Sequence, residues 1–146
     1  IRNWYLCAAL ELEGKAPGAG YSYGGYPAVT AGFPAKGLLD GMSMQLLGDE
    51  TLDMHLSMAF EVDGERCALE IRRGVAEFHE SPTGKEDVVV RLPKPDLDLV
   101  FCRRTSFEKC LEEGSLQIVA GSREDALLFF SKFEWPTAAG IRLTIR

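Results

Sequence analysis

The chain has 146 residues, 46% of them hydrophobic, and a formal net charge of −6, which suits one domain with a substantial core. The negative charge argues against nucleic acid or an anionic membrane surface as the main partner, and the basic doublets are limited to Arg72-Arg73 and Arg103-Arg104. No run reaches the roughly 18 apolar residues of a membrane helix and no signal-peptide pattern is present, so the compartment stays open.

The first 36 residues divide into two segments by composition. Residues 1–13 space their apolar side chains as a helix does and stop before Gly14, which predicts the end of a helix whose packing partners lie upstream. Residues 14–36 are rich in Gly, Pro and Tyr, which favours a linker packed loosely on the domain, with a binding loop as the alternative. Since the chain begins with Ile1 rather than Met, we expect it to be a piece of a longer protein.

A short helix and a long strand are predicted next. Residues 37–47 carry leucine and methionine along one side, as an amphipathic helix does. Residues 52–62 alternate apolar and polar side chains without a break, which is the period of a strand with one buried face. The expected buried residues are Leu52, Met54, Leu56, Met58, Phe60 and Val62. His55, Ser57 and Glu61 mark the solvated face.

Two tight turns predict the neighbours of this strand. Asp63-Gly64 and Arg73-Gly74 both suit two-residue hairpin turns. The first register pairs Phe60 with Cys67, Met58 with Leu69, Leu56 with Ile71 and Glu61 with Arg66. The second pairs Ile71 with Ala76 and Leu69 with Phe78. It also sets Glu70 opposite Glu77, a like-charge pair that only nearby Arg72 would offset.

A pair of helices is expected after the hairpins. Asp96 would cap a helix that runs to about Arg104. Thr105 and Glu108 have the capping-box spacing for a second helix, which Gly114 would end.

The remaining elements complete the predicted fold. Strands are expected at 88–92, at 116–118 and at 141–145, and Ser122 would cap a last helix over 123–133. That helix is apolar on more than one side, so it should be buried on two sides. Hairpins followed by helices indicate an α+β fold, with a mostly antiparallel sheet of about five strands and helices covering one face.

Motifs for catalysis are lacking. The two histidines, His55 and His79, have no metal-ligand spacing, and we interpret them as surface residues. The cysteines lack metal-type pairing, which predicts reduced, mostly buried thiols at Cys7, Cys67, Cys102 and Cys110. No nucleophile motif or phosphate loop is present. We therefore expect no metal, no cofactor and no catalytic residue in this chain, which by itself would not be an enzyme.

Several segments follow one another in the order found in a known fold family. Residues 56–65 lead from a strand through an Asp-Gly-Glu turn, and residues 73–79 open the third strand with Arg-Gly-Val-Ala. With the strand at 88–92, the helix pair at 97–114 and residues 115–121, they resemble the sterol-carrier-protein-type lipid-binding fold. Departures from that pattern occur at Gly48–Thr51, at Cys102–Thr105 and in the Gly/Tyr-rich linker.

A second resemblance narrows the family. The segment Arg2–Leu12, Arg-Asn-Trp-Tyr-Leu-Cys-Ala-Ala-Leu-Glu-Leu, is similar to the segment that precedes this domain in alkyl sulfatases of the metallo-β-lactamase superfamily. The resemblance implies that residues 37–146 are a C-terminal lipid-binding module, non-catalytic, that helps recruit hydrophobic substrate. The zinc-binding catalytic domain and the dimerisation helices would lie upstream in the same parent chain. Residues 1–13 would then be the end of a helix from that upstream dimerisation region, and homodimerisation is left open.

The resemblance also implies which residues hold a fatty or alkyl chain. Carried over by position, the apolar cavity would be lined by Met54, Leu56, Met58, Phe60, Leu69, Ile71, Phe78, Phe101, Phe107, Leu127, Phe130 and Phe133. The alternative is a structural module with a solid core and no ligand, which packs on the parent enzyme. Trp4, Tyr5 and Trp135 are candidate exposed contacts for that role.

Overall fold

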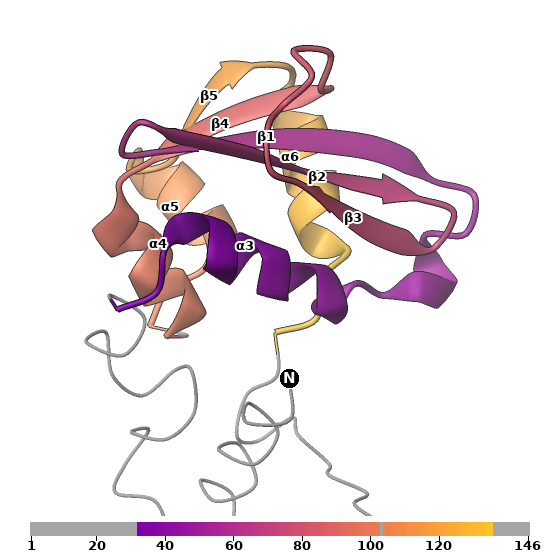
Figure 1. Cartoon of the computed structure of the whole chain (residues 1–146), viewed down its shortest axis with the longest axis horizontal. Coiled ribbons are helices and arrows are strands. Elements are labelled where there is room, and N and C mark those ends of the chain that lie inside the picture. Colours follow the sequence, from indigo (N-terminus) through magenta and orange to yellow (C-terminus); the bar gives the residue numbers. More distant parts are fainter. Residues whose placement is uncertain (1–31, 103, 136–146) are drawn as a thin grey trace, which may run out of the picture.

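The computed structural model describes residues 32–102 and 104–135. The helix predicted at 1–13, most of the linker at 14–36 and the strand predicted at 141–145 lie outside the described residues. Among the described ones, no helix has the length and apolar character needed to cross a membrane. A twisted sheet with helices on one side makes up the fold (Figure 1).

Five strands form one sheet in the described part of the chain, in the order β3-β2-β1-β4-β5. They are β1 His55–Val62, β2 Glu65–Arg72, β3 Val75–His79, β4 Val88–Leu92 and β5 Gln117–Ala120. Strands β1 and β4 are parallel, whereas the other neighbouring pairs are antiparallel. The predicted α+β class with a mostly antiparallel sheet is confirmed.

Both hairpin registers are confirmed as predicted. Each turn has two consecutive residues of positive φ, with values of 47° and 84° for Asp63 and Gly64 and of 51° and 80° for Arg73 and Gly74. This is the backbone geometry of the two-residue turns that match the twist of paired strands. The turns therefore fix which side chains of β1 and β2 share the covered face.

The prediction that β1 begins at residue 52 was wrong. Leu52 is 60% exposed, and the strand starts at His55. The chain before it turns tightly, with the amide of Gly74 donating to the carbonyl of Thr51 at 3.0 Å and the amide of Arg73 donating to Met54 at 3.2 Å. These hydrogen bonds hold the segment against the second hairpin turn, so Leu52 cannot continue the alternation.

The helices lie on one face of the sheet (Figure 1). They are α3 Ala35–Met42, α4 Lys94–Phe101, α5 Phe107–Glu113 and α6 Arg123–Ser131, with 3-10 turns η2 Ser43–Gln45 and η3 Gly48–Glu50. The helix predicted at 37–47 therefore ends five residues early, and two short 3-10 turns follow it.

Two helix caps differ from the prediction by a few residues. Pro93 occupies the N-cap of α4, so Asp96 lies in the first turn instead of capping it. Ser106 rather than Thr105 caps α5, and its hydroxyl accepts a hydrogen bond from the amide of Lys109 at 3.1 Å. Proline suits a helix start because its missing N–H is not needed there.

Helix α6 begins as predicted and ends two residues early. Ser122 caps it by accepting a hydrogen bond from the amide of Asp125 at 3.1 Å. The helix stops at Ser131 because the next residues pair with the segment after α3. The amide of Leu47 donates to the carbonyl of Lys132 at 2.8 Å. This pairing holds the end of α6 against the segment that follows α3.

The uncovered face of the sheet carries polar residues on β1, β2 and β3. Glu70 faces Glu77 across β2 and β3, as predicted. Two histidines also reach Glu70: the Nε2 atom of His55 lies 2.6 Å from Oε2, and the Nε2 atom of His79 lies 3.3 Å from Oε1. The prediction that only Arg72 offsets the two carboxylates was therefore wrong.

The connection between β5 and α6 requires a residue without a side chain at Gly121. Its φ is +90°, and an added Cβ atom would lie 2.4 Å from the carbonyl oxygen of Asp87. We expect Gly121→Ala to lower the free energy of unfolding by roughly 2–4 kcal/mol in urea denaturation. The control is Gly41→Ala in α3, where nothing lies within 4 Å. It should raise the stability by about 0.5–1 kcal/mol. Unchanged stability of Gly121→Ala would contradict this geometry.

The hydrogen bond from His55 holds the pKa of the Glu70 carboxyl below its ordinary value, and His79 adds to this effect. A carboxylate stabilised by folding contributes stability above its unfolded pKa, about 4.3, and the contribution is lost as the pH falls through the lowered pKa. We therefore expect Glu70→Gln to destabilise the protein near neutral pH and to match the wild type in strong acid. Urea melts across the acid range measure this.

The control for that series is Glu112→Gln, which makes the same charge change on the exposed side of α5. Its melts report the effect of net charge alone. A stability difference for Glu70→Gln that does not shrink as the pH falls would contradict the assigned role of the histidines.

Candidate functional site

The covered face of the sheet contributes the base of an apolar cluster. Leu56, Met58 and Phe60 alternate along β1, and Leu69 and Ile71 lie beside them on β2. Leu56 is 6% exposed and the other four are 0% exposed. The structure thus brings together these five predicted lining residues.

Aromatic side chains from the helices complete the cluster. Phe107 of α5 stacks on Phe130 of α6, with ring centroids 4.5 Å apart and planes within 9°. Phe60 of β1 lies 6.1 Å from Phe107. Phe101 and Phe133 are also buried. Five of the six predicted phenylalanines therefore share one interior with the strand residues.

Phe129 also belongs to this interior, although sequence reasoning missed it. Its ring lies 6.3 Å from that of Phe60 and 5.2 Å from that of Phe133, and it is 0% exposed. The signal was its spacing: Ala126, Phe129 and Phe133 recur at intervals of three and four residues, which marks one face of a helix.

The remaining predicted residues lie at the edge of the cluster. Met54, Phe78 and Leu127 are partly buried and pack against it. Trp135 does the same, with its ring 5.1 Å from that of Phe101 in a T-shaped arrangement. We call these four residues the rim. Trp135 is therefore not the fully exposed contact that we expected.

The interior offers apolar surface rather than reactive groups. Among the described residues, the buried polar or charged side chains are Thr51 and Asp98. The Thr51 hydroxyl donates to backbone carbonyls, and Asp98 pairs with Lys94 one helical turn away. Burial raises the pKa of the Cys67 thiol to about 12, so it stays protonated.

The cysteine prediction is confirmed for the described thiols. Cys67 and Cys110 are free thiols, and both are buried, as is Cys102. Cys7 lies outside the described residues.

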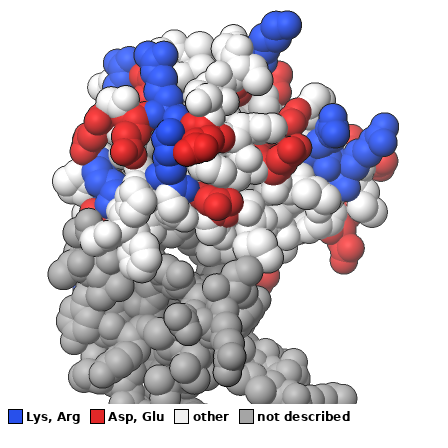
Figure 2. All heavy atoms as spheres, in the orientation of Figure 1, with Lys and Arg blue, Asp and Glu red and all other residues white. Residues whose placement is uncertain are grey.

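A separate polar hollow of about 480 Å³ lies where the turn between β1 and β2 meets the end of β4. Its lining comprises Glu61, Asp63, Gly64, Arg66, Arg91, Leu92, Pro93, Ser115 and Gln117. Arg66 and Arg91 both pair with Glu61, at 3.1 and 2.8 Å. Because the charges compensate one another, this hollow has no strong field for an ionic ligand. On the face shown in Figure 2, basic and acidic side chains are likewise mixed.

Comparisons with known sequences match the chain to alkyl sulfatases. A sequence model of the alkyl sulfatase C-terminal domain matches residues 24–138. A linear primary-alkylsulfatase of Pseudomonas sp. (strain ATCC 19151) is 30% identical over 159 residues, which cover 99% of this chain and 29% of that protein. An (R)-specific secondary-alkylsulfatase of Pseudomonas sp. is 28% identical over 120 residues, covering 80% and 18%. The chain spans less than a third of the length of these relatives.

Solved structures show the same fold. A stereoselective inverting sec-alkylsulfatase from Pseudomonas sp. superposes with a TM-score of 0.65 at 22% identity, covering 94% of this chain and 22% of that one. Palmitated SCP2L2 from Aedes aegypti gives a TM-score of 0.54 at 9% identity, covering 68% and 93%. The sterol-carrier-protein-like fold is confirmed. The ligand-binding role of the twelve residues and the domain boundaries after residues 13 and 36 stay predictions.

Proposed function

Because the chain belongs to the alkyl sulfatase C-terminal domain family, we propose that it binds aliphatic or lipid chains in its apolar interior and helps bring hydrophobic substrate to a sulfatase catalytic domain. The observation that carries this proposal is the continuous apolar cluster between sheet and helices, bordered by a partly exposed rim. Membership of the family makes the chain an accessory domain. Its ligand and its effect on the parent enzyme are the proposed parts.

The energetics suit a long alkyl chain. Each methylene group that leaves water contributes about 0.8 kcal/mol. Eight buried methylenes would therefore contribute roughly 6 kcal/mol before the loss of ligand freedom is subtracted. Within residues 32–102 and 104–135, Asp98 in its pair with Lys94 is the buried charged group that an aliphatic chain could have to desolvate. Affinity would thus grow with chain length.

The interior has the means to make room for such a chain. Met42 and Met58 are both 0% exposed and have unbranched, flexible side chains that repack at low cost. At the rim, Leu127 and Trp135 cover the cluster without being fully buried. We expect the ligand to enter by displacing these two side chains. The palmitated form of the Aedes aegypti protein supports an acyl chain as the ligand class.

The second candidate function is a structural module that contacts the parent enzyme. The stacked rings of Phe107 and Phe130 favour it, since they already fill the space between α5 and α6. In that case the interior would be a solid core, and the function would reside in surface contacts with the rest of a longer chain.

Titration with a fluorescent fatty acid distinguishes the two candidates. The wild type should bind it saturably, and Leu127→Glu should weaken the affinity by about tenfold or more because it places a carboxylate at the rim. The matched control is Leu128→Glu, the next residue of α6, which is 44% exposed. It should bind within about twofold of the wild type.

Circular dichroism shows whether both variants keep the fold. If the folded wild type shows no saturable binding, or if both variants bind as it does, the interior is not the ligand site. The structural-module function would then be favoured.

A further inference from the structure

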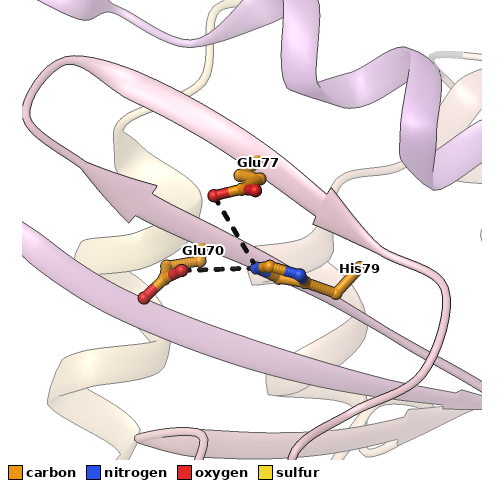
Figure 3. A group of neighbouring side chains, drawn as sticks. All are labelled: Glu70, Glu77 and His79. Atoms are coloured by element: carbon orange, nitrogen blue, oxygen red, sulfur yellow. Dashed lines mark hydrogen bonds and ion pairs between the residues drawn. The ribbon is translucent and has the colours of Figure 1, made fainter.

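The uncovered face of the sheet holds a group of metal-ligating side chains outside the apolar interior. Glu70 comes from β2, and Glu77 and His79 come from β3, with their side chains pointing toward one another (Figure 3). One ligand atom from each lies within 4.8 Å of the other two. This group is a mixture of one imidazole and two carboxylates on two hydrogen-bonded strands, so its geometry is fixed by the sheet register.

The spacing fits a small divalent cation. With bonds of about 2.0–2.2 Å, tetrahedral zinc places its ligand atoms roughly 3.3–3.5 Å apart. The Nε2 atom of His79 lies 3.3 Å from Oε1 of Glu70 and 4.0 Å from Oε2 of Glu77. Small rotations of the Glu77 side chain, which is 58% exposed, would close the wider gap.

The charge distribution also favours a cation at this position. Glu70 and Glu77 are directly opposite each other in neighbouring strands. Like charges in that arrangement destabilise a sheet. His79 lies against both carboxylates, and a divalent ion between the three residues would offset the repulsion between Glu70 and Glu77.

A fourth residue completes the arrangement. The Nε2 atom of His55 on β1 lies 2.6 Å from Oε2 of Glu70, which leaves Oε1 directed toward His79. A hydrogen bond of this kind orients a carboxylate ligand and strengthens its hold on a metal. His55 is therefore a positioning residue for the site.

We propose that Glu70, Glu77 and His79 form a divalent metal site of the zinc class on the outer face of the sheet, with His55 orienting Glu70. Three protein ligands would leave the remaining coordination position to water. The mixed nitrogen and oxygen ligands favour zinc over magnesium, which prefers oxygen ligands in octahedral geometry. A bound ion would fasten β3, which lies at an end of the described sheet, to β2. The site is independent of lipid binding.

Isothermal titration calorimetry of the full chain with zinc chloride, in the presence of a phosphine reductant, tests the proposal. The wild type should bind one zinc ion, and magnesium chloride should give no binding. His79→Ala and Glu77→Gln should each weaken zinc affinity by roughly a hundredfold, and His55→Ala by about tenfold. The matched control is Glu124→Gln on α6, an exposed residue that should leave the affinity unchanged.

Thermal melts with and without zinc give a second readout. Zinc should raise the melting temperature of the wild type and of Glu124→Gln, but not that of His79→Ala. Circular dichroism should show that His79→Ala and Glu124→Gln keep the fold, because neither residue is buried. No binding by the wild type at millimolar zinc overturns the proposal. Equal affinity of His79→Ala and the wild type also overturns it, because the ion would then be held elsewhere.

Discussion

The fold depends on the burial of one face of the β1–β2 hairpin beneath the helices. Met58, Phe60 and Leu69 on that face are 0% exposed, and each such side chain contributes roughly 1.5–3 kcal/mol when it leaves water. The positive-φ turn after β1 fixes the register. A slip of one residue would move all of these side chains to the solvent face. The same register places Glu70 between two histidines on the opposite face. The strand register therefore positions both the apolar interior and the polar group.

Local signals explain which parts of the fold could be predicted. Strict alternation and two turn dipeptides predict both hairpins, and Ser122 and Gly114 mark helix boundaries correctly. The parallel pairing of β1 with β4 could not be predicted, because packing across the whole sheet decides it. The start of β1 was wrong for a similar reason: hydrogen bonds to the second hairpin turn hold Thr51 and Met54 in place and override the alternation that continues through Leu52.

The apolar interior could be predicted from the sequence more completely than the group around Glu70. The apolar interior follows from residue type and period, although Phe129 was missed and Trp135 was expected to be an exposed contact. The Glu70–Glu77 pair follows from the predicted register, but the approach of His55 and His79 to Glu70 was not anticipated, because both histidines are diagonal neighbours of Glu70 and show no spacing typical of a metal site. An accessory domain that binds an alkyl chain on one side of its sheet and a metal ion on the other would keep its two binding events separate.

Native mass spectrometry of the purified protein can show whether the interior opens to hold an aliphatic chain. Spectra are compared before and after gentle extraction with organic solvent, and after adding a long-chain alkyl sulfate. We expect an additional mass that extraction removes, or one-to-one uptake of the added alkyl sulfate. If the protein shows only its own mass in all three spectra, the interior does not hold an aliphatic chain, and the cluster of Phe60, Phe107 and Phe130 is a solid core.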